Sequence, residues 1–185
     1  MLRQVGIMRP RFYLAGPDVF LPDPLAHAAA QKRICFALGL TGISPLDPLD
    51  DEPQDWLALP EAHRIARRNE AHIRSSQAIL ANITPFRGPS ADSGTVYEIG
   101  FGRALGLPVF AYTAAIDDYA VRVQPGATHD ADGLAIEDFG LAENLMIACG
   151  IEESGGFIVR HAGEILAAFE QCAIRAASIL RGERP

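Results

Sequence analysis

The sequence is poor in lysine, cysteine and paired histidine, and each shortage excludes a kind of chemistry. Lys32 is the single lysine among 185 residues, so a Schiff-base mechanism would have one candidate, which lies mid-helix among alanines. The three cysteines, Cys35, Cys149 and Cys172, are widely spaced and fit reduced thiols better than a disulfide framework. The five histidines show no HxxxH or HxH pairing. We therefore expect neither a metal site nor a cofactor.

Positive charge is also scarce. Lysine and arginine number 16 against 23 acidic residues, which gives a formal net charge of -7. Nucleic-acid backbones and anionic membranes both bind to clustered positive charge, so we expect neither as a partner. No apolar run approaches the roughly 18 residues needed to cross a membrane, and the N-terminus lacks a signal-peptide pattern. These absences predict a cytoplasmic protein.

The length and the spacing of apolar segments predict one domain. A chain of 185 residues can hold one full core but not two comfortable ones. We assign residues 1–10 to a loose leader and residues 11–185 to the domain. Periodicity and turn signals predict strands from residue 11 to the Gly16-Pro17 turn, around Ile43, over 78–83 and over 108–112, with helices over 24–38, 61–76, 94–105, 142–149 and 161–181.

This alternation predicts an α/β fold, with a parallel sheet covered by helices on both faces. Such sheets place their ligands beyond the carboxyl ends of the strands. The loops that leave the strands at that edge are Gly16–Phe20, Pro85–Ser93 and the one after Tyr112. The segment 113–132 that follows Tyr112 is polar and irregular, and the sequence assigns it no role.

The stretch 82–106 holds the clearest chemistry, because two carboxylates flank the start of a predicted helix. Asp92 precedes the helix, where unpaired amides and the dipole stabilise an anion, and Gly94 lets the backbone approach a ligand closely. Glu98, about one turn further in, would share that stabilisation and could attack a sugar C1′. In the alternative interpretation, Asp92 is only an N-cap and Glu98 only a solvated helix residue. The apolar neighbours of Glu98 favour the functional interpretation.

Three ordered motifs resemble the nucleoside 2-deoxyribosyltransferase family. The first is YLAGP at 13–17, which is similar to the strand and turn that open the family. The second is ANITPFRGPSADSGTVYEIGFGRALG, which is similar to the family signature, and the third is DFGLAENLM at 138–146, which is similar to its FGLxxNLM segment. Together they span most of residues 11–150, in the family's order.

The resemblance implies a Rossmann-like or flavodoxin-like domain with a five-stranded parallel sheet, assembled into homo-oligomers that share their active sites. It implies that Glu98 is the nucleophile, that Asp92 binds the deoxyribose hydroxyls, and that Tyr13 positions the Glu98 carboxylate. Asn144, with Met146 nearby, would reach into a neighbouring subunit and contact the sugar 5′-hydroxyl. Read without the resemblance, Tyr13 could be a core aromatic and Asn144 an ordinary residue of a first helical turn.

Other positions carry weaker expectations. Gly16 and Gly94 belong to the expected substrate-binding set, and Asp47 resembles a base-side loop, although turn aspartates are common. Many family members have an aspartate where Asn69 falls, and an amide can hydrogen-bond a base but cannot readily protonate it. The general acid is thus left open, with Glu70 adjacent.

The PFRG loop offers two more candidates, Phe86 and Arg87. They could stack on or frame the base, or Arg87 could pair with Asp92 or simply brace the loop.

The resemblance implies transfer of a 2-deoxyribosyl group between nucleobases, with 2′-deoxynucleosides and free nucleobases as substrates, in nucleoside salvage. One rival is a 2′-deoxynucleoside 5′-monophosphate N-glycosidase, which resembles this family but carries a serine where Asn144 stands. A phosphoribohydrolase would need a double glycine that is missing before Gly94. A non-catalytic nucleotide sensor would have no reason to keep both Tyr13 and Glu98.

Overall fold

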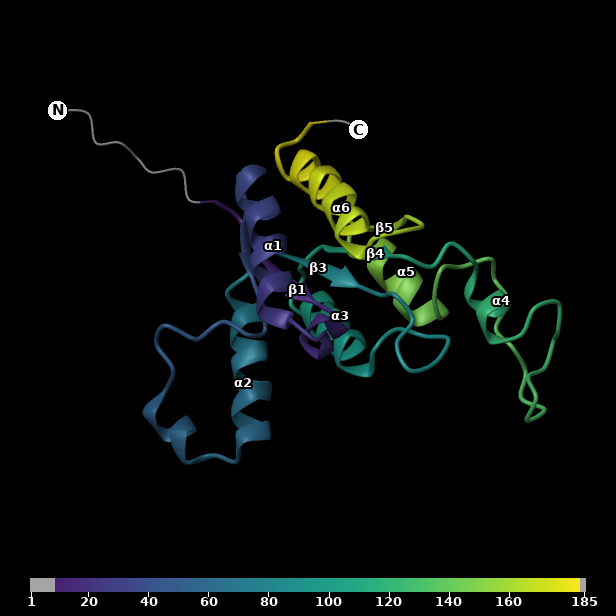
Figure 1. Cartoon of the computed structure of the whole chain (residues 1–185), viewed down its shortest axis with the longest axis horizontal. Coiled ribbons are helices and arrows are strands. Elements are labelled where there is room, and N and C mark those ends of the chain that lie inside the picture. Colours follow the sequence, from purple (N-terminus) through teal and green to yellow (C-terminus); the bar gives the residue numbers. More distant parts are fainter. Residues whose placement is uncertain (1–8, 184–185) are drawn as a thin grey trace.

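Five parallel strands form one sheet at the centre of the molecule. The computed structural model describes residues 9–183, and its strands are β1 (Arg11–Ala15), β2 (Thr41–Ile43), β3 (Ala78–Asn82), β4 (Val109–Thr113) and β5 (Phe157–Arg160). They lie in the order β2-β1-β3-β4-β5 (Figure 1). This is the flavodoxin-like order, in which the topological switch point lies between β1 and β3. The predicted single α/β domain with a five-stranded parallel sheet is confirmed.

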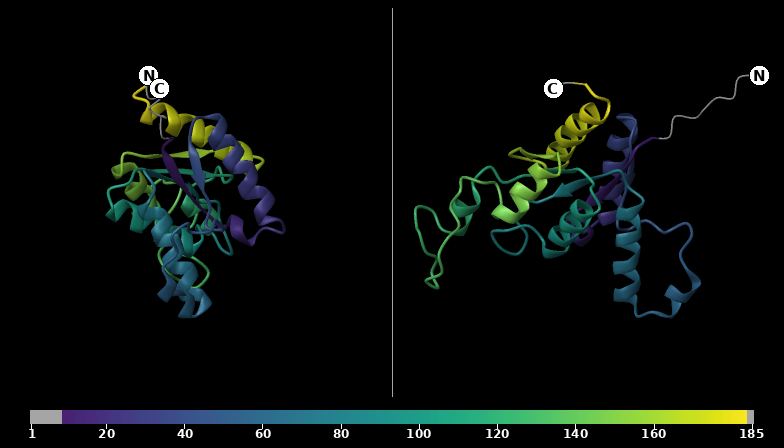
Figure 2. Two further views of the ribbon diagram at one scale, coloured as in Figure 1. Left: turned by 90° about the vertical axis from the view of Figure 1, so that its left-hand side faces the viewer. Right: turned by 180° about the vertical axis from the view of Figure 1, so that it is seen from behind.

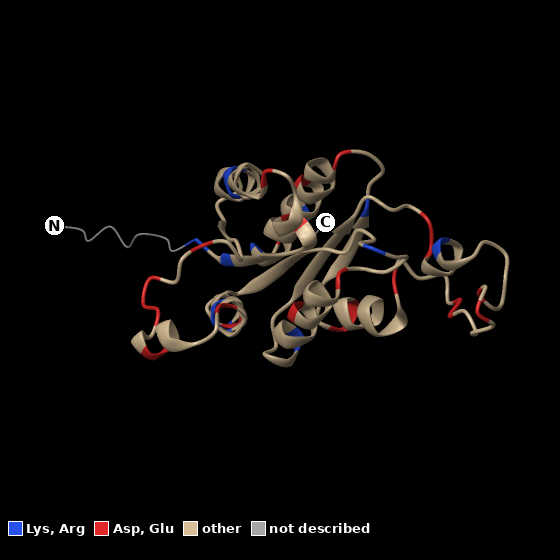
Figure 3. Cartoon of the chain, turned by 60° about the horizontal axis from the view of Figure 1, so that its bottom comes forward, with Lys and Arg blue, Asp and Glu red and all other residues tan. Residues whose placement is uncertain are grey.

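Helices cover both faces of the sheet (Figure 2). Helices α1 (Pro24–Ala37) and α6 (Ile165–Leu180) pack together on one face, and α2 (Glu61–Arg74), α3 (Ser93–Ala104) and α5 (Leu145–Glu153) cover the other. Two 3-10 turns, η1 (Pro17–Phe20) and η2 (Gln54–Ala58), and the short helix α4 (Tyr119–Val123) lie in the connections. Acidic residues gather in the two segments that extend from this body, around 50–55 and 130–138 (Figure 3).

The alternation of side chains along β1 determines which residue faces the candidate site. Phe12 and Leu14 belong to the core beneath α1 and α6, whereas Tyr13 and Ala15 belong to the core on the α3 side. Successive side chains of a strand point to opposite faces, so a shift of β1 by one residue would turn all of these side chains to the other face. Tyr13 therefore lies on the same side of the sheet as Glu98.

Several predicted boundaries were wrong. Strand β5 was not located by the sequence pattern, because its four residues lie at the sheet edge and only Phe157 is fully buried. Helix α5 begins at Leu145 rather than residue 142, since Asn144 caps it, and it continues through Gly150, against which Arg103 packs. Helix α6 begins at Ile165, because the backbone of His161 still pairs with β4.

Other sequence-based expectations have simpler outcomes. The predicted loose leader falls largely on residues 1–8, which lie outside the described residues. Segment 113–132 contains one short helix, α4, within otherwise irregular chain. All three cysteines are free, and Cys149 is only partly buried. Within residues 9–183, no helix has the length and apolar character needed to span a membrane.

Gly156 permits the close packing of the β4 and β5 ends. A Cβ atom there would lie 1.6 Å from the Val109 carbonyl oxygen. Because that neighbour is backbone, we expect Gly156→Ala to lower the free energy of unfolding by at least about 3 kcal/mol. The control Gly100→Ala meets no atom within 4 Å in α3 and should raise stability by up to about 1 kcal/mol. Urea unfolding of both variants measures these changes in stability. Similar stabilities of the two variants would contradict the close packing at Gly156.

Candidate active site

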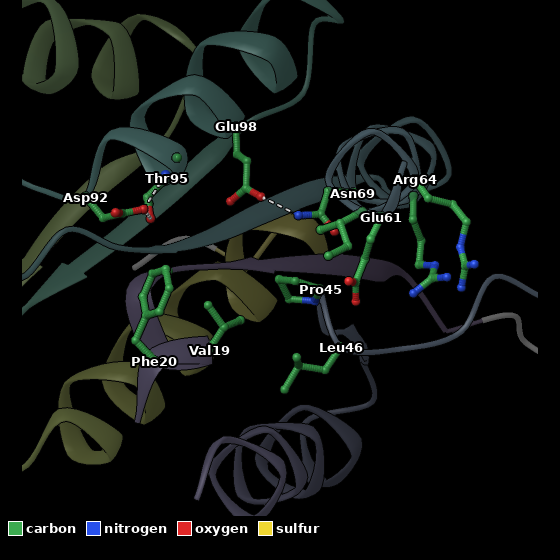
Figure 4. A pocket seen from close by; sticks show the side chains of 14 residues that line it. Val19, Phe20, Pro45, Leu46, Glu61, Arg64, Asn69, Asp92, Thr95 and Glu98 are labelled. Atoms are coloured by element: carbon green, nitrogen blue, oxygen red, sulfur yellow. Dashed lines mark hydrogen bonds between the residues drawn. The ribbon is translucent and has the colours of Figure 1, made fainter. Parts of the chain in front are cut away.

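A cavity of about 500 Å³ opens at the carboxyl edge of the sheet, beside the switch between β1 and β3. Its walls come from four places in the chain: the turn after β1, the loop after β2, helix α2 and the start of α3 (Figure 4). The lining residues are Gly16, Val19, Phe20, Pro45, Leu46, Glu61, Arg64, Ile65, Arg68, Asn69, Asp92, Gly94, Thr95 and Glu98. The cavity therefore lies where the fold class predicts a ligand.

Glu98 is a buried carboxylate in the cavity wall, with only 9% of its surface exposed. The Tyr13 hydroxyl donates a 2.5 Å hydrogen bond to its Oε1 atom, and Asn69 Nδ2 donates a longer one, 3.4 Å, to the same oxygen. Within residues 9–183, Oε2 accepts no hydrogen bond. One oxygen is thus fixed by the protein and the other is free to meet a ligand.

Desolvation strongly affects the acidity of this carboxyl group. Burial raises the pKa of Glu98 from about 4.5 to about 7, and the nearby charge of Asp92 acts in the same direction. The hydrogen bonds from Tyr13 and Asn69 lower that pKa and only partly offset burial. The pKa of Tyr13 is itself raised by burial and by Glu98, which keeps its hydroxyl a donor.

Asp92 both caps α3 and lines the cavity. Its Oδ2 atom accepts from the backbone N–H of Thr95 at 3.0 Å and from the Thr95 hydroxyl at 3.2 Å. Both sequence interpretations are therefore compatible with its position, because Oδ1 makes no hydrogen bond within the described part of the chain. The cap fixes the direction of a carboxylate that still has one oxygen available.

The predicted glycines and Asp47 have different positions. Gly16 and Gly94 line the cavity, and a Cβ atom on Gly16 would lie 2.8 Å from that of Asn82. Asp47 does not line it, although the preceding Pro45 and Leu46 do. The Asp47 carboxylate accepts from the backbone of Ser44 at 3.0 Å and pairs with Lys32. These contacts hold the loop after β2 in shape.

Phe86 and Arg87 lie behind the cavity wall. The Phe86 ring stacks on Phe20, with centroids 5.3 Å apart and planes 15° apart, and the Arg87 guanidinium lies 4.7 Å from the Phe86 centroid. Phe20 lines the cavity, whereas Phe86 and Arg87 do not. Across residues 9–183 there is no ion pair between Arg87 and Asp92. Among the described residues, Phe86 and Arg87 meet the cavity lining at the ring of Phe20.

Asn144 and Met146 lie away from this chain's cavity. Asn144 Oδ1 accepts from the backbone of Met146 at 3.0 Å, and its Nδ2 donates to Glu137 at 2.8 Å. The Met146 side chain is 69% exposed. Their predicted contact with a neighbouring subunit stays a prediction.

Glu143 braces the site and was missed by sequence reasoning. It is 1% exposed and accepts from Ser90 Oγ at 2.7 Å and from the Ala91 backbone at 3.2 Å, while Arg122 pairs with it at 3.1 Å. These bonds attach the loop that carries Asp92 to the segment before α5. Its place inside the third motif, after two apolar residues, was the available signal.

The site and the fold together define a class: parallel α/β domains with a desolvated carboxylate facing a ligand cavity at the β1–β3 switch. The family model for Nucleoside 2-deoxyribosyltransferase matches residues 12–146, and the chain belongs to this family. The 2-desoxiribosyltransferase from Leishmania mexicana is 28% identical, with a TM-score of 0.67 over 89% of this chain and 97% of that one.

Two further similar proteins have names that state no activity. A conserved protein from Enterococcus faecalis is 21% identical, with a TM-score of 0.53 over 89% of this chain and 99% of that one, and it shows the fold alone. An uncharacterized protein of Schizosaccharomyces pombe is 27% identical over 169 residues, which cover 80% of each chain.

Ionisation of Glu98 should oppose folding above neutral pH. The folded state holds this proton more tightly than the unfolded state, so wild-type stability falls as pH rises from about 4.5 to about 7. Glu98→Gln mimics the protonated form and should raise the free energy of unfolding by about 2–3 kcal/mol near pH 8. The gain should fall to about 1 kcal/mol or less at pH 5, because stability is lost only as pH rises from the unfolded pKa to the folded one. Urea unfolding at both pH values measures it, and a pH-independent difference would contradict the raised pKa.

Proposed function

We propose that this protein is a nucleoside 2-deoxyribosyltransferase that works by double displacement through Glu98. The observation that carries the proposal is the state of the Glu98 carboxylate. It is buried, fixed at Oε1 by Tyr13, and free at Oε2 on the cavity side. Family membership and the similarity to the Leishmania mexicana enzyme supply the substrate class.

In the first step, Glu98 Oε2 attacks C1′ of a bound 2′-deoxynucleoside. The bond from C1′ to the base nitrogen breaks, its electron pair leaves with the base, and a glycosyl ester forms on the carboxylate. Desolvation strengthens the nucleophile, because the free oxygen has no hydrogen-bonded partner to give up. Tyr13 orients the carboxylate through its hydrogen bond to Oε1 and does not contact Oε2.

In the second step, a nitrogen of another base attacks C1′ from the vacated face. The carboxylate leaves with its electron pair, so two inversions give net retention. The proton that the departing base takes up balances the one that the incoming base loses. Asn69, next to Glu98, can hydrogen-bond a ring nitrogen but supplies no proton.

The carboxylate of Asp92 and, from a second copy, the amide of Asn144 complete the proposed site. Asp92 Oδ1 accepts from a deoxyribose hydroxyl, since its other oxygen is occupied by the helix cap. In the proposed homo-oligomer, Asn144 and Met146 of a second copy complete each site, and the 69% exposure of Met146 supports this role. We assign the activity to nucleoside salvage in the cytoplasm.

The decisive assay is chromatography of the protein incubated with 2′-deoxyinosine and adenine. We expect 2′-deoxyadenosine to form, with much slower release of hypoxanthine when adenine is omitted. Glu98→Gln should lower the rate at least about a thousandfold, because it removes the nucleophile. Glu170→Gln, an exposed change on the opposite face, should leave the rate unchanged.

Three outcomes would contradict the proposal. Equal hypoxanthine release with and without adenine would indicate a hydrolase. Release from 2′-deoxynucleoside 5′-monophosphates alone would indicate the N-glycosidase. Full activity of Glu98→Gln would remove Glu98 from the mechanism.

A further inference from the structure

The cavity changes in character along its length. Near α3 it is lined by the polar side chains of Asp92, Thr95 and Glu98. Its middle is apolar, because Val19, Leu46 and Ile65 line it. Its far end carries charged groups from α2, among them Glu61 and Arg64 (Figure 4).

This order fixes how a nucleoside would lie. Hydroxyl-bearing deoxyribose suits the polar end at Glu98, and a flat base suits the apolar slot between Leu46 and Ile65. On α2, Arg64 lies five residues before Asn69, which is about 7.5 Å along the helix axis. The edge of the base remote from the sugar therefore faces the charged end.

We propose that Arg64 and Arg68, held by Glu52, select 6-oxopurines (guanine and hypoxanthine) as the bases that this enzyme exchanges. The inference rests on the proposed function and adds the substrate class. Arg68 Nη2 donates to Glu52 Oε1 at 2.9 Å, and Arg64 Nε lies 3.4 Å from the same oxygen. One carboxylate oxygen thus holds the guanidinium groups of two residues that line the same end of the cavity.

Donors remain unused in this arrangement. Arg68 Nη1 and the terminal nitrogens of Arg64 donate no hydrogen bond within residues 9–183. A guanidinium fork matches the O6 and N7 acceptors of a 6-oxopurine, whereas adenine presents its N6 amino donor there. A pyrimidine is shorter and would leave its polar edge in the apolar slot.

Glu61 completes the complementarity. It lines the same end of the cavity and makes no ion pair within the described part of the chain. Its carboxylate can accept the N1–H of a 6-oxopurine, which adenine lacks. With Glu52 and Glu61 opposing Arg64 and Arg68, this end carries no formal net charge. That balance suits a neutral base edge and disfavours a phosphate dianion.

Internal competition tests this selectivity. The donor is 2′-deoxyinosine, and guanine and adenine are present at equal concentrations. Both acceptors compete for the same glycosyl-enzyme intermediate, so the ratio of the two products is independent of the overall activity. We expect 2′-deoxyguanosine to exceed 2′-deoxyadenosine by about tenfold. Arg64→Met and Arg68→Met should each reduce this ratio severalfold, and Arg64→Lys should restore it only in part.

Arg67→Met is the matched control. Arg67 lies on the same helix with its guanidinium over the Trp56 ring at 5.6 Å, outside the cavity lining, so the ratio should not change. A wild-type ratio near one or favouring adenine, or an unchanged ratio in both arginine variants, would overturn the proposal. If no transfer occurs at all, the proposed function fails. Equilibrium binding of free guanine and adenine then decides the selectivity alone, and equal affinities would overturn it.

Discussion

The hydrogen bond from Tyr13 to Glu98 joins the middle of β1 to the second turn of α3 in a place that water scarcely reaches. A carboxylate in such a place loses solvation, and the pKa of Glu98 is raised to about 7 even though Tyr13 and Asn69 donate hydrogen bonds to it. The Tyr13 hydrogen bond limits this rise in pKa, and both donors bind Oε1, so that Oε2 is left without one. The second oxygen stays exposed to the cavity, and the proposed chemistry depends on that asymmetry.

The rest of the site keeps this pair in place. Strand alternation turns Tyr13 toward α3, and the cap made by Asp92 starts the helix so that Glu98 meets the phenol. The buried pair of Glu143 with Arg122 holds the loop before Asp92 against the segment that begins α5. Removing either Glu143 or Arg122 would leave the other charge buried without a partner, which is strongly destabilising.

Sequence periodicity predicted the parallel α/β domain, and helix-start chemistry singled out Asp92 and Glu98, whereas the family resemblance alone placed Tyr13 beside Glu98. The pattern did not locate β5, whose edge position removes most of its apolar signal. It also missed Glu143, since a buried ion pair depends on distant segments meeting. The apolar slot and the arginine end of the cavity arise where α2 faces two loops, and no single stretch of sequence encodes such a meeting.

Mass spectrometry of the protein quenched during turnover of 2′-deoxyinosine without an acceptor base tests directly whether Glu98 is the nucleophile. We expect a peptide that contains Glu98 and carries one added deoxyribosyl group, and we expect this adduct to disappear when adenine is supplied. Product formation with no adduct at any time, or an adduct on a different residue, would contradict the central claim that Glu98 is the nucleophile.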